Sequence, residues 1–91
     1  GKRMSAQRRI HLFLMHLETG QRYPVSEEEL VIGRSSGDIL FPDDNKLSAQ
    51  HCRIVKTPAG LAIHDLGSHN GTVVDGHQLE HGKMYLFKAG S

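Results

Sequence analysis

Turn-forming residues divide this chain into short apolar runs, and this punctuation restricts the folds that the chain can form. The runs recur about every 8–12 residues, a spacing typical of β-sandwiches and β-barrels. The 10 glycines also favour a fold rich in turns over a helical bundle. The runs expected to form strands are residues 30–32, 38–40, 52–56, 61–65, 72–74 and 84–87. We therefore predict an all-β domain, built as a sandwich or a barrel.

Two of the turns carry hairpin patterns. Residues 57–60 (Thr-Pro-Ala-Gly) separate the alternating run 52–56 from its expected partner strand 61–65, and Asp75-Gly76 is a pair favoured in two-residue type I′ hairpins. The apolar run 9–17 is less specific, because its weak alternation fits either a strand or a short helix.

The length suits one domain. At 91 residues the chain is short for a two-sheet sandwich, which takes about 100 residues. We assign residues 9–91 to the domain, and residues 1–8 to a flexible amino-terminal segment or a cloning remnant, since Gly-Lys-Arg precedes Met4. A further strand is expected where the sequence stops, so the domain either lacks its last strands or completes its sheet in another way. An open sheet edge there would invite dimerisation or strand exchange.

Charge and cysteine content argue against several classes of function. Eleven Lys and Arg against ten Asp and Glu give a net charge of +1, without the basic excess of a nucleic-acid-binding domain. The basic residues Lys2, Arg3, Arg8 and Arg9 are interpreted as a solvated terminus. No apolar run approaches the roughly 20 residues needed to span a bilayer. The lone Cys52 excludes an internal disulfide. We expect a cytoplasmic protein that binds neither nucleic acid nor a membrane.

Polar residues gather in three of the predicted loops rather than along the strands. These loops are residues 33–36 (Gly-Arg-Ser-Ser), 47–51 (Leu-Ser-Ala-Gln-His) and 68–72 (Ser-His-Asn-Gly-Thr). If they converge at one end of a sandwich, they present a guanidinium, several hydroxyls, an amide and an imidazole to one ligand. This set suits a phosphate, which carries about −1.5 to −2 charges and three acceptor oxygens. Arginine matches such a group with two parallel hydrogen bonds.

The order and spacing of these residues resemble the pattern of the forkhead-associated (FHA) domain. The matching pieces are Gly33-Arg34, Ser48-x-x-His51, and Asp65 followed by Asn70-Gly71-Thr72. The resemblance implies an FHA-like antiparallel β-sandwich of eleven strands whose end loops bind a phosphothreonine peptide. It implies no enzymatic activity and no cofactor. The implied partner is a threonine-phosphorylated protein, with a Ser/Thr kinase acting upstream.

The resemblance also implies roles for single residues. Arg34 corresponds to the arginine that holds the phosphate, and Ser48 to the serine that donates to a phosphate oxygen. Asn70 corresponds to the asparagine that bonds the peptide backbone, and His69 stands at a variable position that touches the phosphate or the pocket for the threonine methyl group. The positions that shape the loops are Gly33, His51, Gly71 and Thr72.

Two positions depart from the family pattern. Ala49 stands where many relatives carry a basic or amide side chain that adds a ligand contact, so binding is expected to be weaker. Asp75 replaces the common asparagine before Gly76, a change that keeps the turn chemistry.

Other interpretations compete with these roles. Arg34 could form a surface ion pair with Asp38, His77 and His81 could bind a metal ion, and Ser48, His51 and Asp65 could form a catalytic triad. We expect no metal site, because the segment holding the two histidines reads as strand and turn. No nucleophile-elbow sequence accompanies the three triad residues. The main alternative is an FHA fold that serves as an assembly module without phosphate.

Overall fold

The computed structural model describes residues 12–88 and 90–91, and these residues form only strands and loops. The predicted flexible segment, residues 1–8, lies outside this part of the chain. So do residues 9–11, the start of the predicted domain and of the apolar run 9–17. Within it, no helix is long and apolar enough to cross a membrane. The nine strands are β1 (Phe13–Met15), β2 (Arg22–Pro24), β3 (Glu29–Gly33), β4 (Ile39–Leu40), β5 (Cys52–Thr57), β6 (Gly60–Asp65), β7 (Val73–Val74), β8 (His77–Gln78) and β9 (Met84–Phe87).

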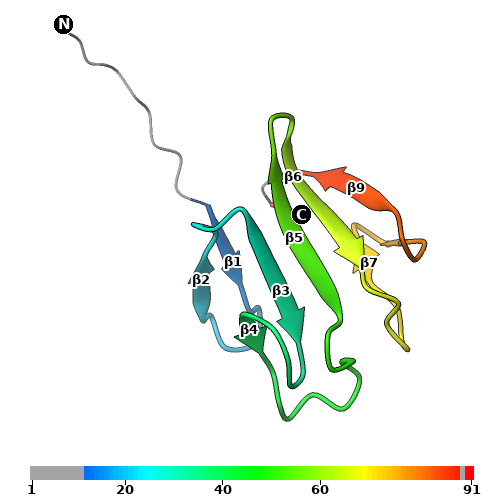
Figure 1. Cartoon of the computed structure of the whole chain (residues 1–91). Helices are drawn as coiled ribbons and strands as arrows, with labels where there is room; N and C mark the ends of the chain where they lie inside the picture. Colours follow the sequence, from blue (N-terminus) through cyan, green and yellow to red (C-terminus); the bar gives the residue numbers. More distant parts are fainter. Residues whose placement is uncertain (1–11, 89) are drawn as a thin grey trace, which may run out of the picture.

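Five strands form the main sheet, in the order β4-β3-β5-β6-β9 (Figure 1). All its pairs are antiparallel except β3–β4, which is parallel. The hairpins β1–β2 and β7–β8 form two separate two-stranded sheets. The all-β sandwich is thus confirmed, with one parallel pair that the local sequence pattern does not reveal. Within the described residues there are nine strands, whereas the family resemblance implies eleven.

The core lies between the main sheet and the two hairpins. Ile54 of β5 pairs with Leu30 of β3 on one side and with Ile63 of β6 on the other. All three side chains are buried, and side chains from both hairpins pack against them, among them Leu14, Tyr23 and Val74. Successive residues of a strand point to opposite faces. Arg53 therefore points outward, where it binds Glu29 and His64 at 2.7 and 3.0 Å. This alternation produced the strand pattern seen in the sequence.

Several local predictions can be compared directly with the observed strands and turns. The run 9–17 contains a strand, β1, and no helix in its described part. Residues 57–60 join β5 to β6 as a hairpin. Asp75 and Gly76 join β7 to β8 with φ angles of 49° and 82°, the left-handed values that a type I′ turn requires.

The topology places three loops at one end of the main sheet. Because β5 is antiparallel to both β3 and β6, the last residues of β3 and β6 lie beside the first residue of β5. The β3–β4, β4–β5 and β6–β7 loops consequently lie at the same end, opposite the β5–β6 hairpin (Figure 1). These are the three polar loops of the sequence.

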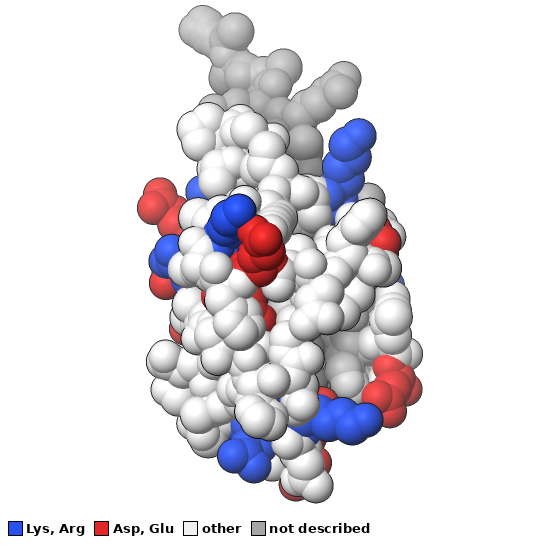
Figure 2. Space-filling view, turned by 90° about the vertical axis from the view of Figure 1, so that its right-hand side faces the viewer, with Lys and Arg blue, Asp and Glu red and all other residues white. Residues whose placement is uncertain are grey.

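The edge strand β9 carries exposed apolar side chains. Met84 and Leu86 point to the outer face of the main sheet and are 46% and 63% exposed. Figure 2 shows the side of the molecule on which β9 lies, and residues other than Lys, Arg, Asp and Glu form most of this surface. Nothing within the described residues pairs with the outer edge of β9.

Candidate functional site

The β3–β4 loop is packed directly against the β4–β5 loop. The Arg34 N–H donates to the carbonyl of Ser48 at 2.9 Å, and the Ser36 N–H donates to that of Ala49 at 3.0 Å. Gly33 permits this approach, because a Cβ at that position would lie 2.1 Å from the Ala49 carbonyl oxygen. The residue before Arg34 therefore has to be glycine for the two loops to meet.

The Arg34 side chain is exposed at this junction. Its guanidinium takes part in no hydrogen bond or ion pair with another described residue. The carboxylate of Asp38, considered above as its ion-pair partner, instead accepts from the Val31 N–H at 2.8 Å. The guanidinium is thus available to a ligand.

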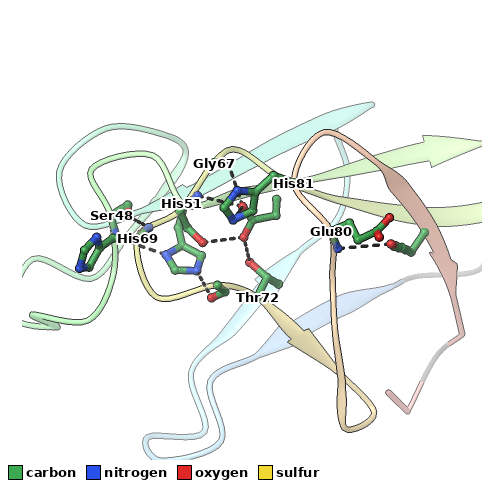
Figure 3. A network of polar contacts seen from close by, with 11 residues as sticks. Ser48, His51, Gly67, His69, Thr72, Glu80 and His81 are labelled. Carbon is green, nitrogen blue, oxygen red and sulfur yellow. Dashed lines mark hydrogen bonds and ion pairs between the residues drawn. The ribbon is translucent and has the colours of Figure 1, made fainter.

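Ser48 joins the β4–β5 loop to the β6–β7 loop. Its half-buried hydroxyl oxygen accepts a hydrogen bond from the His69 N–H at 3.0 Å. A serine hydroxyl has one proton and two lone pairs, so it can still donate its proton to an anion while it holds this contact. His69 itself is exposed beside it (Figure 3).

His51 is buried and connects the same two loops from behind (Figure 3). Its Nδ1 accepts from the Ser48 N–H at 3.2 Å, which fixes the proton of the neutral ring on Nε2. Nε2 then donates to the carbonyl of Gly71 at 2.7 Å. Both ring nitrogens are bound to the backbone, and neither contacts the Ser48 hydroxyl or Asp65. The three residues therefore do not have the arrangement of a catalytic triad.

Asp65 holds the β6–β7 loop and was not recognised from the sequence as a structural residue. Its carboxylate is fully buried. It accepts from the N–H groups of Gly67 and Ser68 at 2.9 and 2.8 Å, and from the hydroxyls of Ser68 and Thr72 at 2.6 Å each. His81 Nε2 lies 3.4 Å from the same carboxylate (Figure 3). The available signal was an aspartate at a strand end followed by nearby Ser and Thr.

Burial and hydrogen bonding act in opposite directions on Asp65. Burial tends to raise the pKa of its carboxyl, but the donors from Ser68, Thr72 and Gly67 outweigh it and lower the pKa from 3.8 to about 2. The neighbouring Cys52 receives no such donor from the residues that the structure describes. Its burial, reinforced by the negative charge of Asp65, raises the pKa of the thiol to about 11. Asp65 is therefore ionised at neutral pH, whereas Cys52 is an unreactive thiol.

Asn70 is exposed and attached to the β4–β5 loop. Its Nδ2 donates to the carbonyl of Lys46 at 2.8 Å. The next residue, Gly71, has a φ of +86°, which glycine adopts without strain. The structure thus brings Arg34, Ser48, His69 and Asn70 to three loops at one end of the sheet, of which the β4–β5 loop is hydrogen-bonded to each of the other two. Together these residues offer a free guanidinium, a hydroxyl, an imidazole and a carboxamide.

In a β-sandwich whose polar residues gather on loops at one end, those loops are the part placed to meet a ligand. The chain belongs to the FHA domain family, whose family model matches residues 30–91. FHA domains are protein-interaction modules rather than enzymes.

Relatives of known sequence and structure agree with this assignment. The FHA domain-containing protein FhaB of Mycobacterium tuberculosis is 37% identical over 57 residues, which cover 63% of this chain and 37% of FhaB. The structure is also similar to that of EmbR of M. tuberculosis in complex with a low-affinity phosphopeptide. That match has a TM-score of 0.76 and 29% identity, and it covers 86% of this chain and 21% of EmbR.

A third relative is the FHA domain of the CT664 protein from Chlamydia trachomatis. It has a TM-score of 0.62 and 30% identity, over 68% of this chain and 65% of that one. The chain thus spans only a minor part of the length of FhaB and of EmbR.

Proposed function

We propose that this FHA domain binds phosphothreonine on a partner protein through Arg34, Ser48 and Asn70. The observation that carries the proposal is the exposed guanidinium of Arg34, which has no partner among the described residues although the backbone around it is fixed by hydrogen bonds. The structural neighbour EmbR was solved with a phosphopeptide, which supports a ligand of this kind.

Each polar group has a separate task in this proposal. The Arg34 guanidinium forms two parallel hydrogen bonds to the phosphate. The Ser48 hydroxyl donates to another phosphate oxygen while it accepts from the His69 N–H. The free carboxamide oxygen of Asn70 bonds the peptide backbone, and the ring of His69 borders the phosphothreonine. The partner is a substrate of a Ser/Thr kinase. The free thiol of Cys52 suits a reducing compartment such as the cytoplasm.

The loop-shaping residues act through the backbone. Gly33 lets the β3–β4 loop approach Ala49, and His51 links Ser48 to Gly71. Thr72 ties the far end of the β6–β7 loop to Asp65. The methyl side chain of Ala49 cannot donate a hydrogen bond, so a moderate affinity is expected.

Replacement of Arg34 by alanine tests the proposal. A hydrogen bond to a charged group contributes about 1.5–3 kcal/mol. We therefore expect Arg34→Ala to weaken phosphothreonine-peptide binding by about ten- to a hundredfold, as measured by isothermal titration calorimetry. Lys56→Ala, which removes an exposed cation from β5 well away from these loops, is the charge-matched control. Affinity of Arg34→Ala within threefold of the wild type, with an unchanged melting temperature, would exclude the assigned role.

The same titration shows whether the domain prefers phosphothreonine to phosphoserine. A phosphothreonine peptide should bind better than its phosphoserine analogue, because burial of one methyl group contributes about 0.8 kcal/mol. The unphosphorylated threonine peptide should not bind measurably. Equal binding of all three peptides would contradict phosphate recognition.

A second candidate function is assembly without phosphate. It is favoured by exposed apolar side chains on β7 and β9 and by the unpaired edge of β9. Val73 of β7 is 62% exposed and Leu86 of β9 is 63% exposed, and the outer edge of β9 has no strand beside it within the described chain. An uncovered edge of this kind can pair with a strand of another molecule, which gives dimerisation or strand exchange. Light scattering over a range of protein concentrations tests this candidate independently of any peptide.

A further inference from the structure

A groove beside the proposed phosphate site is not used by the function described so far. It lies between the β1–β2 turn and the β4–β5 loop, is open to solvent and has a volume of about 660 Å³. The residues that matter for its chemistry are His16, Glu18, Phe41, Asp43, Asp44 and Lys46.

The groove and the proposed phosphate site share a wall. Lys46 lines the groove, and its carbonyl accepts the hydrogen bond from Asn70 Nδ2 at 2.8 Å. A peptide whose backbone is bonded by Asn70 therefore lies next to the groove.

The groove is preformed. The ring of Phe41 lies 4.9 Å from that of His16 and 6.0 Å from that of Tyr23, so rings from β1–β2 fix the apolar wall. The Asp44 N–H donates to the carbonyl of Phe41 at 3.1 Å, and the Lys46 N–H donates to the Asp44 carboxylate at 2.9 Å. A ligand that enters this groove therefore meets a wall that is already ordered.

The polar rim of the groove is negative, although the whole chain carries a net charge of +1. Three carboxylates, those of Glu18, Asp43 and Asp44, face one ammonium group, that of Lys46. Glu18 and Asp43 take part in no hydrogen bond or ion pair within the part of the chain that the structure describes. An apolar wall with a free acidic rim matches a side chain with an aliphatic stem and a cationic head.

We infer that this groove selects phosphorylated partners in which a lysine or arginine flanks the phosphothreonine. The inference rests on the proposed phosphothreonine binding and adds a specificity site to it. The stem of the basic residue packs on Phe41, and its cationic head lies between Glu18 and Asp43. The groove is then occupied by the same peptide that Arg34 and Ser48 hold by its phosphate.

The test uses phosphothreonine peptides with alanine at every flanking position except one, which carries arginine or glutamate. An exposed ion pair contributes about 0.2–1 kcal/mol. With two free carboxylates, the best arginine peptide should bind about three- to tenfold more tightly than its glutamate counterpart. The preference should weaken in 0.5 M NaCl, because salt screens exposed charges.

A variant without the two free carboxylates tests whether the arginine preference arises in the groove. Glu18→Gln/Asp43→Asn should reduce the arginine preference to less than twofold and leave the all-alanine phosphopeptide unaffected. The matched control Glu27→Gln/Glu28→Gln removes two exposed carboxylates between β2 and β3, at the other end of β3. It should keep the preference.

The possible outcomes separate the two proposals. Phosphate-dependent binding with no preference for arginine at any position would overturn the specificity role of the groove and leave the proposed function intact. An arginine preference that persists in Glu18→Gln/Asp43→Asn would also overturn this role of the groove. Failure of every phosphopeptide to bind would overturn both.

Discussion

At the scale of single residues, the proposed site depends on small and buried residues as much as on those that reach the ligand. Arg34 is exposed, but Gly33 behind it brings its loop against Ala49. Ser48 is oriented by His51 beneath it and by His69 beside it. The proposed ligand-binding groups are thus held by contacts within the protein, and a site preorganised in this way loses less entropy on binding.

Gly33→Ala should damage both stability and binding. The added Cβ would overlap the Ala49 carbonyl oxygen, so the two loops must move apart. Overpacking of this kind costs about 1–3 kcal/mol, and Arg34 would shift with its loop. We expect a lower urea midpoint and phosphopeptide affinity reduced at least fivefold.

Gly60→Ala is the control for this substitution. Gly60 lies in the β5–β6 hairpin with a φ of +131° and no atom within 4 Å of an added Cβ. Alanine there should lower stability through backbone strain and leave affinity unchanged. Wild-type affinity in Gly33→Ala would show that the contact of the two loops does not position Arg34.

The sequence indicated the polar residues of the three loops and the loop-shaping role of the buried His51, but not the role of the buried Asp65. The spacing of Arg34, Ser48 and Asn70 is visible in the chain, and the structure places all three on adjoining loops. The buried role of Asp65 was missed, because a hydrogen-bonded carboxylate looks the same in sequence as an exposed one. Its four donors come from residues 67, 68 and 72, and only the folded loop brings them to it.

At the scale of elements, the β6–β7 loop is built around one buried charge. Asp65 ends β6, and its carboxylate accepts two backbone N–H groups and the hydroxyls of Ser68 and Thr72. A buried carboxylate is tolerated only when its oxygens are well paired. The ionised carboxylate of Asp65 therefore stabilises the loop that carries His69 and Asn70.

The stability that depends on Asp65 should disappear in acid. Its pKa in the folded protein, about 2, lies below the value of about 3.9 for an unfolded chain. The ionised form therefore stabilises the fold above about pH 4, and this contribution is lost as the pH falls toward 2. Asp65→Asn should lower the free energy of unfolding by about 1–3 kcal/mol at pH 7, and the difference from the wild type should shrink between about pH 4 and 2.

Urea titrations at a series of pH values measure this difference. If Asp65→Asn does not fold, Thr72→Val serves instead. It removes one donor to the carboxylate and should move acid unfolding to higher pH. A wild-type-minus-variant difference that stays constant from pH 7 to pH 2 would contradict the role assigned to the charge.

The elements themselves were predictable to different degrees. Strand β5 alternates because one of its faces is buried and the other is more exposed, and the predicted positions of β5 and β6 hold. Strand β4 has only two residues and pairs in parallel with β3. This pairing depends on the path of the β3–β4 loop, which the local sequence pattern does not reveal. The run 9–17 was ambiguous because so short a strand presents too few residues to establish a period.

At the scale of the whole molecule, the proposed binding loops and the open strands occupy different places. The loops lie at one end of the main sheet, whereas β9 is the strand at one side edge of that sheet (Figure 1). Leu86 points outward from the middle of β9 and pairs with Ala62 of β6 rather than with any loop residue. Phosphopeptide binding and self-association should therefore be separable by substitution.

Leu86→Lys should separate them. If β9 mediates association, the wild type should show a mass above that of a monomer at high concentration in light scattering, because uncovered edges pair. A charge on this exposed position should hold the variant at the monomer mass, while phosphopeptide affinity stays within twofold, since Arg34 and Ser48 belong to other elements. Ala59→Lys, at the exposed turn between β5 and β6, is the charge-matched control and should associate like the wild type. A monomeric wild type at every concentration would eliminate assembly through β9, and weaker peptide binding by Leu86→Lys would show that the two surfaces are coupled.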